Sequence, residues 1–419
     1  SALREFEAVR VIEALRSGIA SRHLSAILSY GREGLLEKVQ RDLDTVAEGR
    51  EARALILKGD YGEGKTHFLN IIFNHAQKRN FVVSFVVLSK ETPFNRLDRV
   101  YPKIASNTYL PGEVEPGIEK LLGDVKPNSQ LADKILLFAE RELHPKVSYV
   151  VQNYFEARDT YHHHLLSGDL MGDWLPLNQL KSLHRLNFDR SAKIERFKAR
   201  LHVRDYLRLL AYLIKLRGYA GWVILFDEFE LVGTLGAAAR GDAYFHLGEF
   251  LFPEEGEGEA LLATYPVFSI ASRFWPDILL RERKPDIEEI PARIAGKGDA
   301  QKAELVRRAL NSLLQEAVTL EALPSSQVQR ILAEVCRLHG QAYGWEPGLN
   351  LERILEATRQ ARLRTKIRYT LEYLDIKYLY GEEPTVRAGA LEELPLNAGG
   401  EEGEEESEDV DMVAGGGEG

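Results

Sequence analysis

Residues 59–66 contain the clearest chemistry in the chain. They read Gly-Asp-Tyr-Gly-Glu-Gly-Lys-Thr, the pattern of a phosphate-binding loop. Glycines let the backbone curl until its N–H groups point inward at the phosphates of a nucleotide. Lys65 would add a cation for the outer phosphates, and Thr66 a hydroxyl for Mg²⁺. We expect the nucleotide to contact Gly59, Asp60, Tyr61, Gly62, Glu63, Gly64, Lys65, Thr66 and His67.

A second motif, residues 223–228, supplies carboxylates. Four apolar residues predict a buried parallel strand, and Asp227 and Glu228 come where it ends. That end is where open α/β sheets bind ligands. We assign Asp227 to orient Mg²⁺ together with Thr66, and Glu228 to polarise the attacking water. The alternative is that Asp227 and Glu228 only cap a strand at the surface. We interpret the nearby Glu230 as a solvated residue.

The neighbouring residues predict the elements that hold these groups. Apolar residues 54–57 suit a buried strand before the loop, and residues 68–73 suit a helix after it, with its positive end at the phosphates. A third strand over 265–272 would place Ser272, or Ser269, beside the γ-phosphate. Beyond it we expect a helix that ends near residue 284, followed by a strand near 287–290.

Arg281 and Arg283 lie between the third strand and that further strand. They either complement the dipole of a helix C-terminus or reach the nucleotide of a neighbouring subunit as arginine fingers.

The order of these parts resembles the AAA+ branch of the P-loop ATPases that includes origin-recognition and STAND proteins. Residues 30–36 are similar to the Gly-Arg-Glu element that lies near the adenine in that branch. The resemblance therefore implies that Gly31 and Arg32 lie near the nucleotide. It also implies a helical lid, and residues 301–381 show amphipathic helical spacing. A lid arginine would report loss of the γ-phosphate, with Arg364 the first candidate and Arg368 the second; the alternative is a solvated basic helix face.

A closer resemblance is to the BrxC/BrxD-type ATP-binding proteins of BREX and related bacterial phage-defence loci. Residues 11–18, 58–69, 87–90 and 93–96 carry it. By eye it covers roughly residues 5–110 and 220–380. It implies a role in phage defence or DNA processing, with a helicase-like protein as partner.

Composition bounds the class of protein. The chain has 419 residues, 44% of them hydrophobic, and a single cysteine, Cys336, which excludes an internal disulfide and fits a reducing cytoplasm. No stretch is long and apolar enough to span a bilayer. The net charge of −10 does not represent the folded body of the protein, because residues 401–419 hold nine acidic residues and no Lys or Arg. We expect that acidic segment to be disordered and either solubilising or a competitor for a basic surface.

A large insertion separates the two motifs. We expect it over residues 111–217, with helical stretches at 131–142, 147–155 and 191–217. Residues 181–217 hold eleven Lys/Arg against three acidic residues, which suits either nucleic-acid phosphates or a solvated face. His162, His163 and His164 are consecutive and cannot face one way on a helix, so we interpret them as surface residues and not a metal site.

Together these features predict an α/β P-loop NTPase core with a parallel sheet, AAA+/origin-recognition-like, with a helical insertion and a C-terminal helical lid. The expected division is a helical segment at 1–50, the ATPase core at 51–110 and 218–296, the insertion at 111–217, the lid at 297–382 and the acidic tail at 383–419. An Asn-Lys-x-Asp element is absent from the sequence, which favours ATP over GTP.

The predicted function is a cytoplasmic, Mg²⁺-dependent ATPase that couples nucleotide state to DNA or a helicase-type partner, with homo-oligomers possible. The first alternative is an ATP-switched scaffold for a helicase with little turnover, and the second is a phosphotransferase with a small-molecule acceptor.

Overall fold

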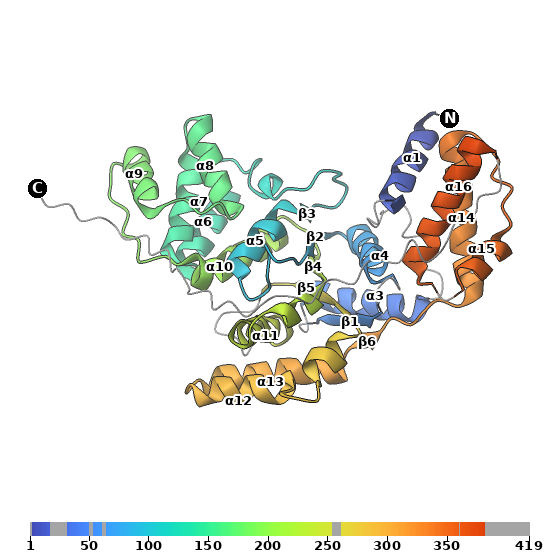
Figure 1. Ribbon diagram of the computed structural model, residues 1–419. Coiled ribbons are helices and arrows are strands. Elements are labelled where there is room, and N and C mark those ends of the chain that lie inside the picture. Colours follow the sequence, from blue (N-terminus) through green and yellow to red (C-terminus); the bar gives the residue numbers. More distant parts are fainter. Residues whose placement is uncertain are drawn as a thin grey trace, which may run out of the picture.

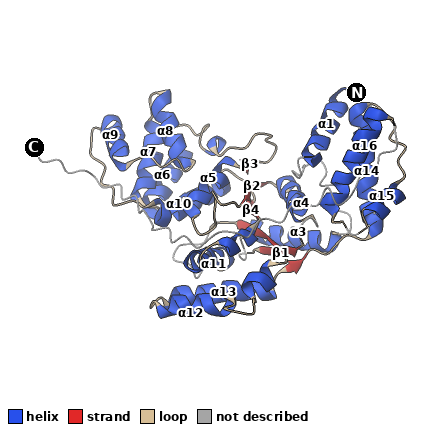
Figure 2. Cartoon of the chain, in the orientation of Figure 1, coloured by secondary structure: helices blue, strands red, loops and turns tan. Residues whose placement is uncertain are grey.

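The computed structural model of the chain describes residues 2–16, 32–49, 53–60, 64–253, 261–359 and 361–381. A central sheet is flanked by helices on both faces (Figures 1 and 2). Within the described residues, its strands follow the order β3-β2-β4-β5-β1-β6. Their bounds are β1 Leu55–Gly59, β2 Phe81–Val87, β3 Thr108–Tyr109, β4 Gly221–Asp227, β5 Thr264–Ala271 and β6 Val318–Thr319.

All neighbouring strands pair in parallel except β3, which is antiparallel to β2. Strand β5 lies between β1 and β4, and it pairs with both. The carboxyl ends of these three strands therefore share one edge of the sheet, where ligands bind in open α/β folds. The mostly parallel α/β architecture predicted from the sequence is confirmed at this level.

Alternating side chains of the strands feed two separate hydrophobic cores. In β4, Trp222, Ile224 and Phe226 enter one core, and Val223 and Leu225 enter the other. All seven residues of β4 are buried. This is the pattern of a central parallel strand covered on both faces, and it explains why the strand reads as a continuous apolar run.

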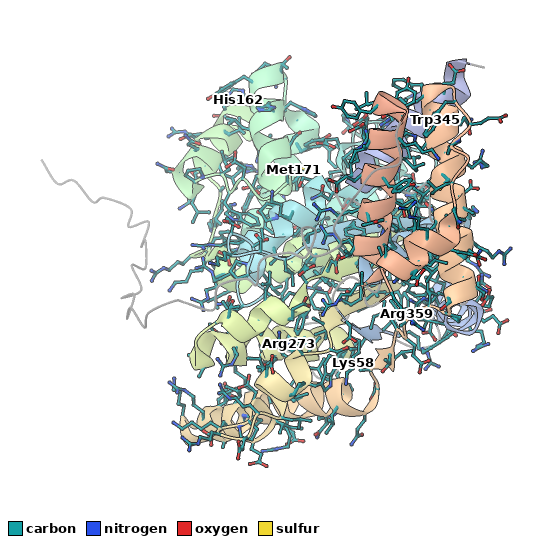
Figure 3. All side chains as sticks on the ribbon, turned by 45° about the vertical axis from the view of Figure 1, so that its right-hand side comes forward. Lys58, His162, Met171, Arg273, Trp345 and Arg359 are labelled. Carbon is teal, nitrogen blue, oxygen red and sulfur yellow. The ribbon has the colours of Figure 1, made fainter. Side chains whose placement is uncertain are left out.

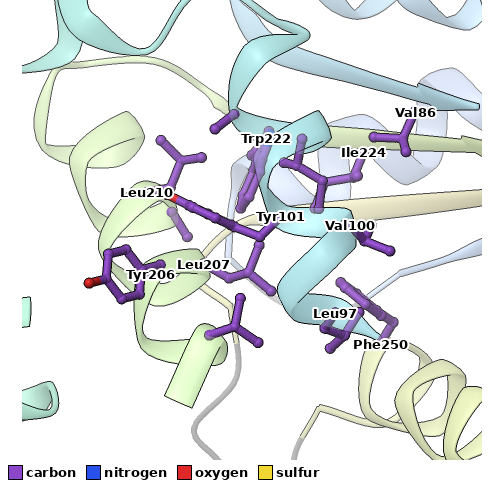
Figure 4. Packing of buried hydrophobic residues seen from close by; sticks show 14 of the residues in the cluster. Val86, Leu97, Val100, Tyr101, Tyr206, Leu207, Leu210, Trp222, Ile224 and Phe250 are labelled. Atoms are coloured by element: carbon purple, nitrogen blue, oxygen red, sulfur yellow. The ribbon is translucent and has the colours of Figure 1, made fainter. Parts of the chain in front are cut away.

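The first core lies under α5 Leu97–Ser106, α10 Ala199–Leu216, α11 Ala237–Leu251 and α13 Ala300–Gln315. Figure 4 shows how Tyr206, Leu207 and Leu210 of α10 pack toward Tyr101 of α5 and Trp222 of β4. Because α10 is the last helix of the insertion, the insertion is anchored directly on the sheet.

The insertion contains more helices than the sequence predicted. After η2 Glu119–Leu121 come α6 Gln130–Glu142, α7 Pro145–Glu156, α8 Thr160–Leu170, α9 Leu177–Phe188 and α10. Helices α8 and α9 were not expected. The stretch predicted to be helical from 191 begins only at Ala199, because Asp189 ends α9 with a left-handed backbone (φ 50°) and the N–H of Lys198 donates to His202 Nδ1 at the start of α10.

The second core lies under α3 Glu33–Ala47 and α4 Lys65–Lys78, and continues into α1 Ala2–Arg16, α14 Ser325–Tyr343, α15 Leu351–Ala357 and α16 Leu363–Tyr380. Helix α1 packs against α14 and α16, far along the chain (Figure 1). Arg16 forms an ion pair with Asp375 and donates a hydrogen bond to Tyr343. Figure 3 labels Trp345 and Arg359 in this group, on the opposite side of the molecule from His162 of the insertion.

The strand expected near 287–290 is wrong. Residues Asp286–Gly296 form helix α12, which packs against α13. Ile287, Ile290 and Ile294 are spaced by three and four residues, which is one face of a helix and not an alternating strand. The expected preceding helix is also absent at 281–284; the turn of π-helix η4 ends at Leu279. The acidic tail predicted over 383–419 lies outside the described residues.

Candidate nucleotide site

The loop between β1 and α4 depends on two glycines. Gly64 has a φ of 92°, a backbone region that other residues rarely adopt. A Cβ built on Gly59 would lie 3.1 Å from Cγ of Lys65, so glycine there lets the lysine fold back along the strand. The three loop residues between Asp60 and Gly64, which are Tyr61, Gly62 and Glu63, lie outside the described residues.

Lys65 is buried and only 6% exposed. Its Nζ donates to the backbone carbonyl of Asp60 at 3.2 Å, so the side chain curls over the loop. Among the described residues this carbonyl is the only hydrogen-bond acceptor of the ammonium group, so its other N–H groups remain available for a ligand. This position therefore suits a group that brings negative charge to the loop.

The two motifs meet between α4 and β4. The hydroxyl of Thr66 donates to Oδ2 of Asp227 at 2.6 Å, and the N–H of Glu228 donates to Oδ1 of Asp227 at 3.0 Å. Asp227 is 2% exposed. A hydroxyl and a carboxylate held this close form an all-oxygen donor set, which fits Mg²⁺. The residues present thus fit the metal that the sequence predicted.

Glu228 lies at this edge in a strained conformation. Its backbone is left-handed, with a φ of 63° and a ψ of 34°. Burial, followed by the nearby carboxylates of Glu230 and Asp227, raises the pKa of Glu228 to about 8, against an opposing effect of Lys65. A carboxyl group with a pKa near neutrality beside a phosphate-binding loop is suited to proton transfer.

Glu230 is not the solvated residue that the sequence predicted. It is half-buried, and its Oε2 accepts a hydrogen bond of 3.0 Å from the N–H of Ala271 at the end of β5. Its carboxylate also hydrogen-bonds the side chain of Glu228. This contact could not be predicted from local residue types, because it depends on how β5 lies beside β4.

Ser272 lies at the same edge, directly after β5. Its N–H donates to the carbonyl of Gly59 at 3.0 Å, between the loop and the carboxylates. Ser269, three residues earlier, is fully buried within the sheet, and its Oγ has no hydrogen-bond partner among the described residues. Ser272 is thus the serine nearer the loop, and its role as a sensor stays a prediction.

The start of α16 lies against the loop. Cδ2 of Leu363 is 3.7 Å from the position that a Cβ on Gly64 would occupy. Burial, and secondarily the charge of Arg364, lowers the pKa of His67 to about 4, so His67 is neutral at pH 7. Nδ1 of His67 is buried without a hydrogen-bond partner in the described part of the chain. Arg364 therefore comes close to the loop from nearly three hundred residues away.

The remaining residues predicted for the site lie in other elements or outside the described residues. Arg32 is buried and precedes α3, while Gly31 lies outside the described residues. Arg281 is engaged within its own segment: its Nε donates to the carbonyl of Lys284, and its guanidinium is 3.6 Å from buried Asp286. Arg283 is exposed. The arginine-finger role of either residue stays a prediction.

The basic segment 181–217 divides into two parts. The arginines of α10 and its end form ion pairs, although Arg200 is itself exposed: Arg200 with Asp242, Arg204 with Glu249, Arg208 with Asp205 and Glu142, and Arg217 with Asp124. In contrast, Lys181 and Arg185 on α9 and Lys193 after it are exposed to solvent. Arg200 and Arg204 therefore join α10 to α11 of the core, whereas Arg208 and Arg217 pair within the insertion.

The described residues lack two further features. They contain no cluster of three or more His, Cys, Asp or Glu side chains that could hold a metal ion. His162, His163 and His164 lie on α8, where His162 pairs with Asp159 at the helix start. None of the described helices combines the length and apolar character needed to cross a membrane.

The first part of the chain is similar to a known family. Residues 3–124 match the family model described as BREX system ATP-binding protein BrxC/D. The match contains the phosphate-binding loop and the residues after β2, while Asp227 and Glu228 lie beyond it. No curated protein matches the chain. The resemblance to BrxC/D-type ATP-binding proteins that the sequence predicted is therefore confirmed over residues 3–124.

Proposed function

We propose that this chain is an AAA+-like ATPase that hydrolyses ATP and couples its nucleotide state to DNA or to a helicase-type protein in phage defence. The contact between Thr66 and Asp227 carries this proposal, because it joins the phosphate-binding loop to a carboxylate pair that is 161 residues away in the sequence. Support also comes from the family match, whose description names an ATP-binding protein.

In this proposal the buried ammonium of Lys65 binds the outer phosphates, and the N-terminus of α4 adds its partial positive charge. Thr66 and Asp227 would hold Mg²⁺, which when bound neutralises developing charge on the phosphate oxygens. These residues bind and orient the substrate, so that the γ-phosphate faces Glu228.

Glu228 would act as the general base. Its carboxylate accepts a proton from a water molecule while the water oxygen bonds to the γ-phosphorus. The bond between that phosphorus and the β–γ bridging oxygen breaks, and ADP and phosphate are released. With its pKa near 8, Glu228 is mostly protonated at pH 7 before nucleotide binds, so it must lose its proton first. Separation from Glu230 would favour that loss.

The lid helices α14–α16 would change position when the γ-phosphate is lost. Arg364 starts α16 beside His67 and the loop, which suits a contact that is made with ATP and lost with ADP. Helix α1 is tied to α14 and α16 through Arg16, so a movement of α16 would extend to the N-terminal helix. The domain division stated above is part of this proposal.

Steady-state ATP turnover tests the proposal. It is measured with Mg²⁺ or with EDTA, with and without duplex and single-stranded DNA, on samples sized by light scattering. We expect Mg²⁺-dependent turnover in the enzyme range of roughly 1–1000 per second once the effector is present. Turnover far below that range, and unchanged by DNA or by oligomerisation, would favour the ATP-switched scaffold instead.

The nucleic-acid partner has its own test. Reversing the three exposed charges Lys181→Glu, Arg185→Glu and Lys193→Glu should weaken DNA binding and lower its salt dependence, by about 0.9 in log–log slope per duplex phosphate contact. A matched control reverses Lys126, Lys134 and Arg141, which are exposed in and before α6 of the same insertion. Equal loss in both variants would show that only overall charge matters.

A further inference from the structure

One motif of the sequence has no role in the site described so far. Residues 93–96, Pro-Phe-Asn-Arg, lie in the segment that follows β2. This segment leaves the sheet at the same edge as the catalytic carboxylates, since the N–H of Leu88 donates to the carbonyl of Asp227 at 3.1 Å. Phe94 then turns inward and is 1% exposed.

The ring of Phe94 touches both phenylalanines that flank the carboxylate pair. Its centroid is 5.3 Å from that of Phe226, the residue before Asp227, and 5.2 Å from that of Phe229, the residue after Glu228. Both contacts are edge-to-face, the arrangement that aromatic rings favour. Phe268 of β5 closes the cluster at 5.6 Å from Phe94.

Glu228 needs such support. A left-handed backbone at a residue other than glycine persists only where its surroundings fix it. Phe226 and Phe229 are fully buried on either side of the Asp-Glu pair. Phe94 bridges the two from the segment after β2, and Phe268 bridges them from β5, so the two rings together fix the chain before and after the turn that aims the carboxyl group of Glu228.

We propose that Phe94 is a positioning residue for Glu228. It acts through Phe226 and Phe229, holds the left-handed turn and thereby keeps the carboxylate in place for water activation; this rests on the ATPase function proposed above. Removing the ring leaves room for Phe229 to shift, so that the turn relaxes and the carboxylate moves. A displacement of about 1 Å in such a group lowers turnover by roughly 100-fold without touching the nucleotide.

The experiment measures ATP turnover and equilibrium ATP affinity of full-length Phe94→Leu and Phe94→Met, with thermal melts as the folding check. Phe81→Leu is the matched control, since Phe81 is equally buried but lies at the opposite end of β2. We expect both Phe94 variants to lose roughly 10- to 100-fold in kcat with ATP affinity within about twofold of wild type. Phe81→Leu should lower the melting temperature and leave kcat within about threefold.

A second arm asks whether Phe94 acts through Glu228. In single turnovers, Phe94→Leu should slow the Glu228→Gln protein no further, because residues that act as a unit are not additive. The inference is overturned if the two changes multiply, if the Phe94 variants lose ATP affinity in proportion to kcat, or if they behave like Phe81→Leu. Should the wild type itself show no hydrolysis with or without DNA, the proposed ATPase function fails, and this inference with it.

Discussion

Two buried lysines in this protein have opposite surroundings. Lys146 of the insertion is 1% exposed, and its Nζ donates to Asp169 at 2.5 Å and to Tyr206 at 3.3 Å while lying over the ring of Phe197. Lys65 of the phosphate-binding loop is 6% exposed and donates to a single backbone carbonyl among the described residues.

The carboxylates near these lysines differ in the same way. Asp169 accepts hydrogen bonds from Lys146, Tyr206 and the N–H of Leu175, so its charge is fully matched. Burial raises the pKa of Glu228, and the two other carboxylates that it faces raise it further. A buried charge that is satisfied holds a fold together, whereas one that is left short of partners indicates where a ligand belongs.

The largest predicted effect is the loss of protein stability when Lys146 is replaced. Lys146→Ala leaves Asp169 buried without its cation, which costs about 3–5 kcal/mol of unfolding free energy. Urea unfolding followed by circular dichroism measures this. The double variant Lys146→Met/Asp169→Asn should recover part of the loss, because it removes the uncompensated charge. A Lys146→Ala protein as stable as wild type would remove the structural half of the comparison.

Lys65→Ala should weaken ATP binding and have a smaller effect on stability. Losing a charge-assisted contact with phosphate weakens ATP binding by about 1.5–3 kcal/mol, or roughly 10- to 100-fold. The unfolding free energy of the nucleotide-free protein should change less than in Lys146→Ala, since within the described residues Lys65 hydrogen-bonds to a backbone carbonyl and not to a carboxylate. Isothermal titration calorimetry with ATP and Mg²⁺ gives the affinity. Unchanged affinity would show that the nucleotide does not lie on this loop.

A pH dependence sharpens the contrast between the carboxylates. The folded-state pKa of Glu228, about 8, is above its ordinary value of 4.5, so the folded protein holds that proton longer than the unfolded chain. Glu228 therefore lowers stability progressively as the pH rises from about 5 to 8.5, by at most about 4 kcal/mol. Glu228→Gln should raise the melting temperature at pH 8.5 more than at pH 5.5. Equal gains at both pH values would contradict the raised pKa.

The smallest predicted effect compares two arginines on helices. Arg364→Ala should lower ATP turnover about fivefold to tenfold, consistent with about 1–1.4 kcal/mol for a partly exposed charge beside the phosphates. Arg204→Ala in α10 removes the partner of buried Glu249 and should lower stability without a specific loss of turnover. Turnover assays at saturating ATP, with melts as control, distinguish the two. Unaltered turnover in Arg364→Ala would leave α16 without a sensing role.

The parts of the fold predicted from the sequence are those where local residues decide the structure. Strand β1, the loop glycines and helix α4 follow from their own residue types, and the apolar run of β4 requires a buried parallel strand wherever it lies. Lys65, Thr66, Asp227 and Glu228 could therefore be singled out without coordinates.

What the sequence could not provide depends on distant contacts. The packing of α1 on α14 and α16, and the contact of Glu230 with the end of β5, join segments far apart in the chain. The mistaken strand at 287–290 has a local cause: its two isoleucines fit a strand until their spacing, continued at Ile294, is compared with a helical face. The sequence also could not show which basic residues face solvent, because most of the ion-pair partners of α10 lie on other elements.

The central claim is that Glu228 activates water for attack on ATP held by the loop, and one measurement tests it most directly. Glu228→Gln is compared with wild type in ATP affinity and in single-turnover hydrolysis, in the presence of Mg²⁺ and any DNA effector. We predict retained ATP binding with hydrolysis slowed by roughly 100- to 10,000-fold. Hydrolysis at the wild-type rate would contradict the assignment and leave the Asp-Glu pair as the cap of a strand.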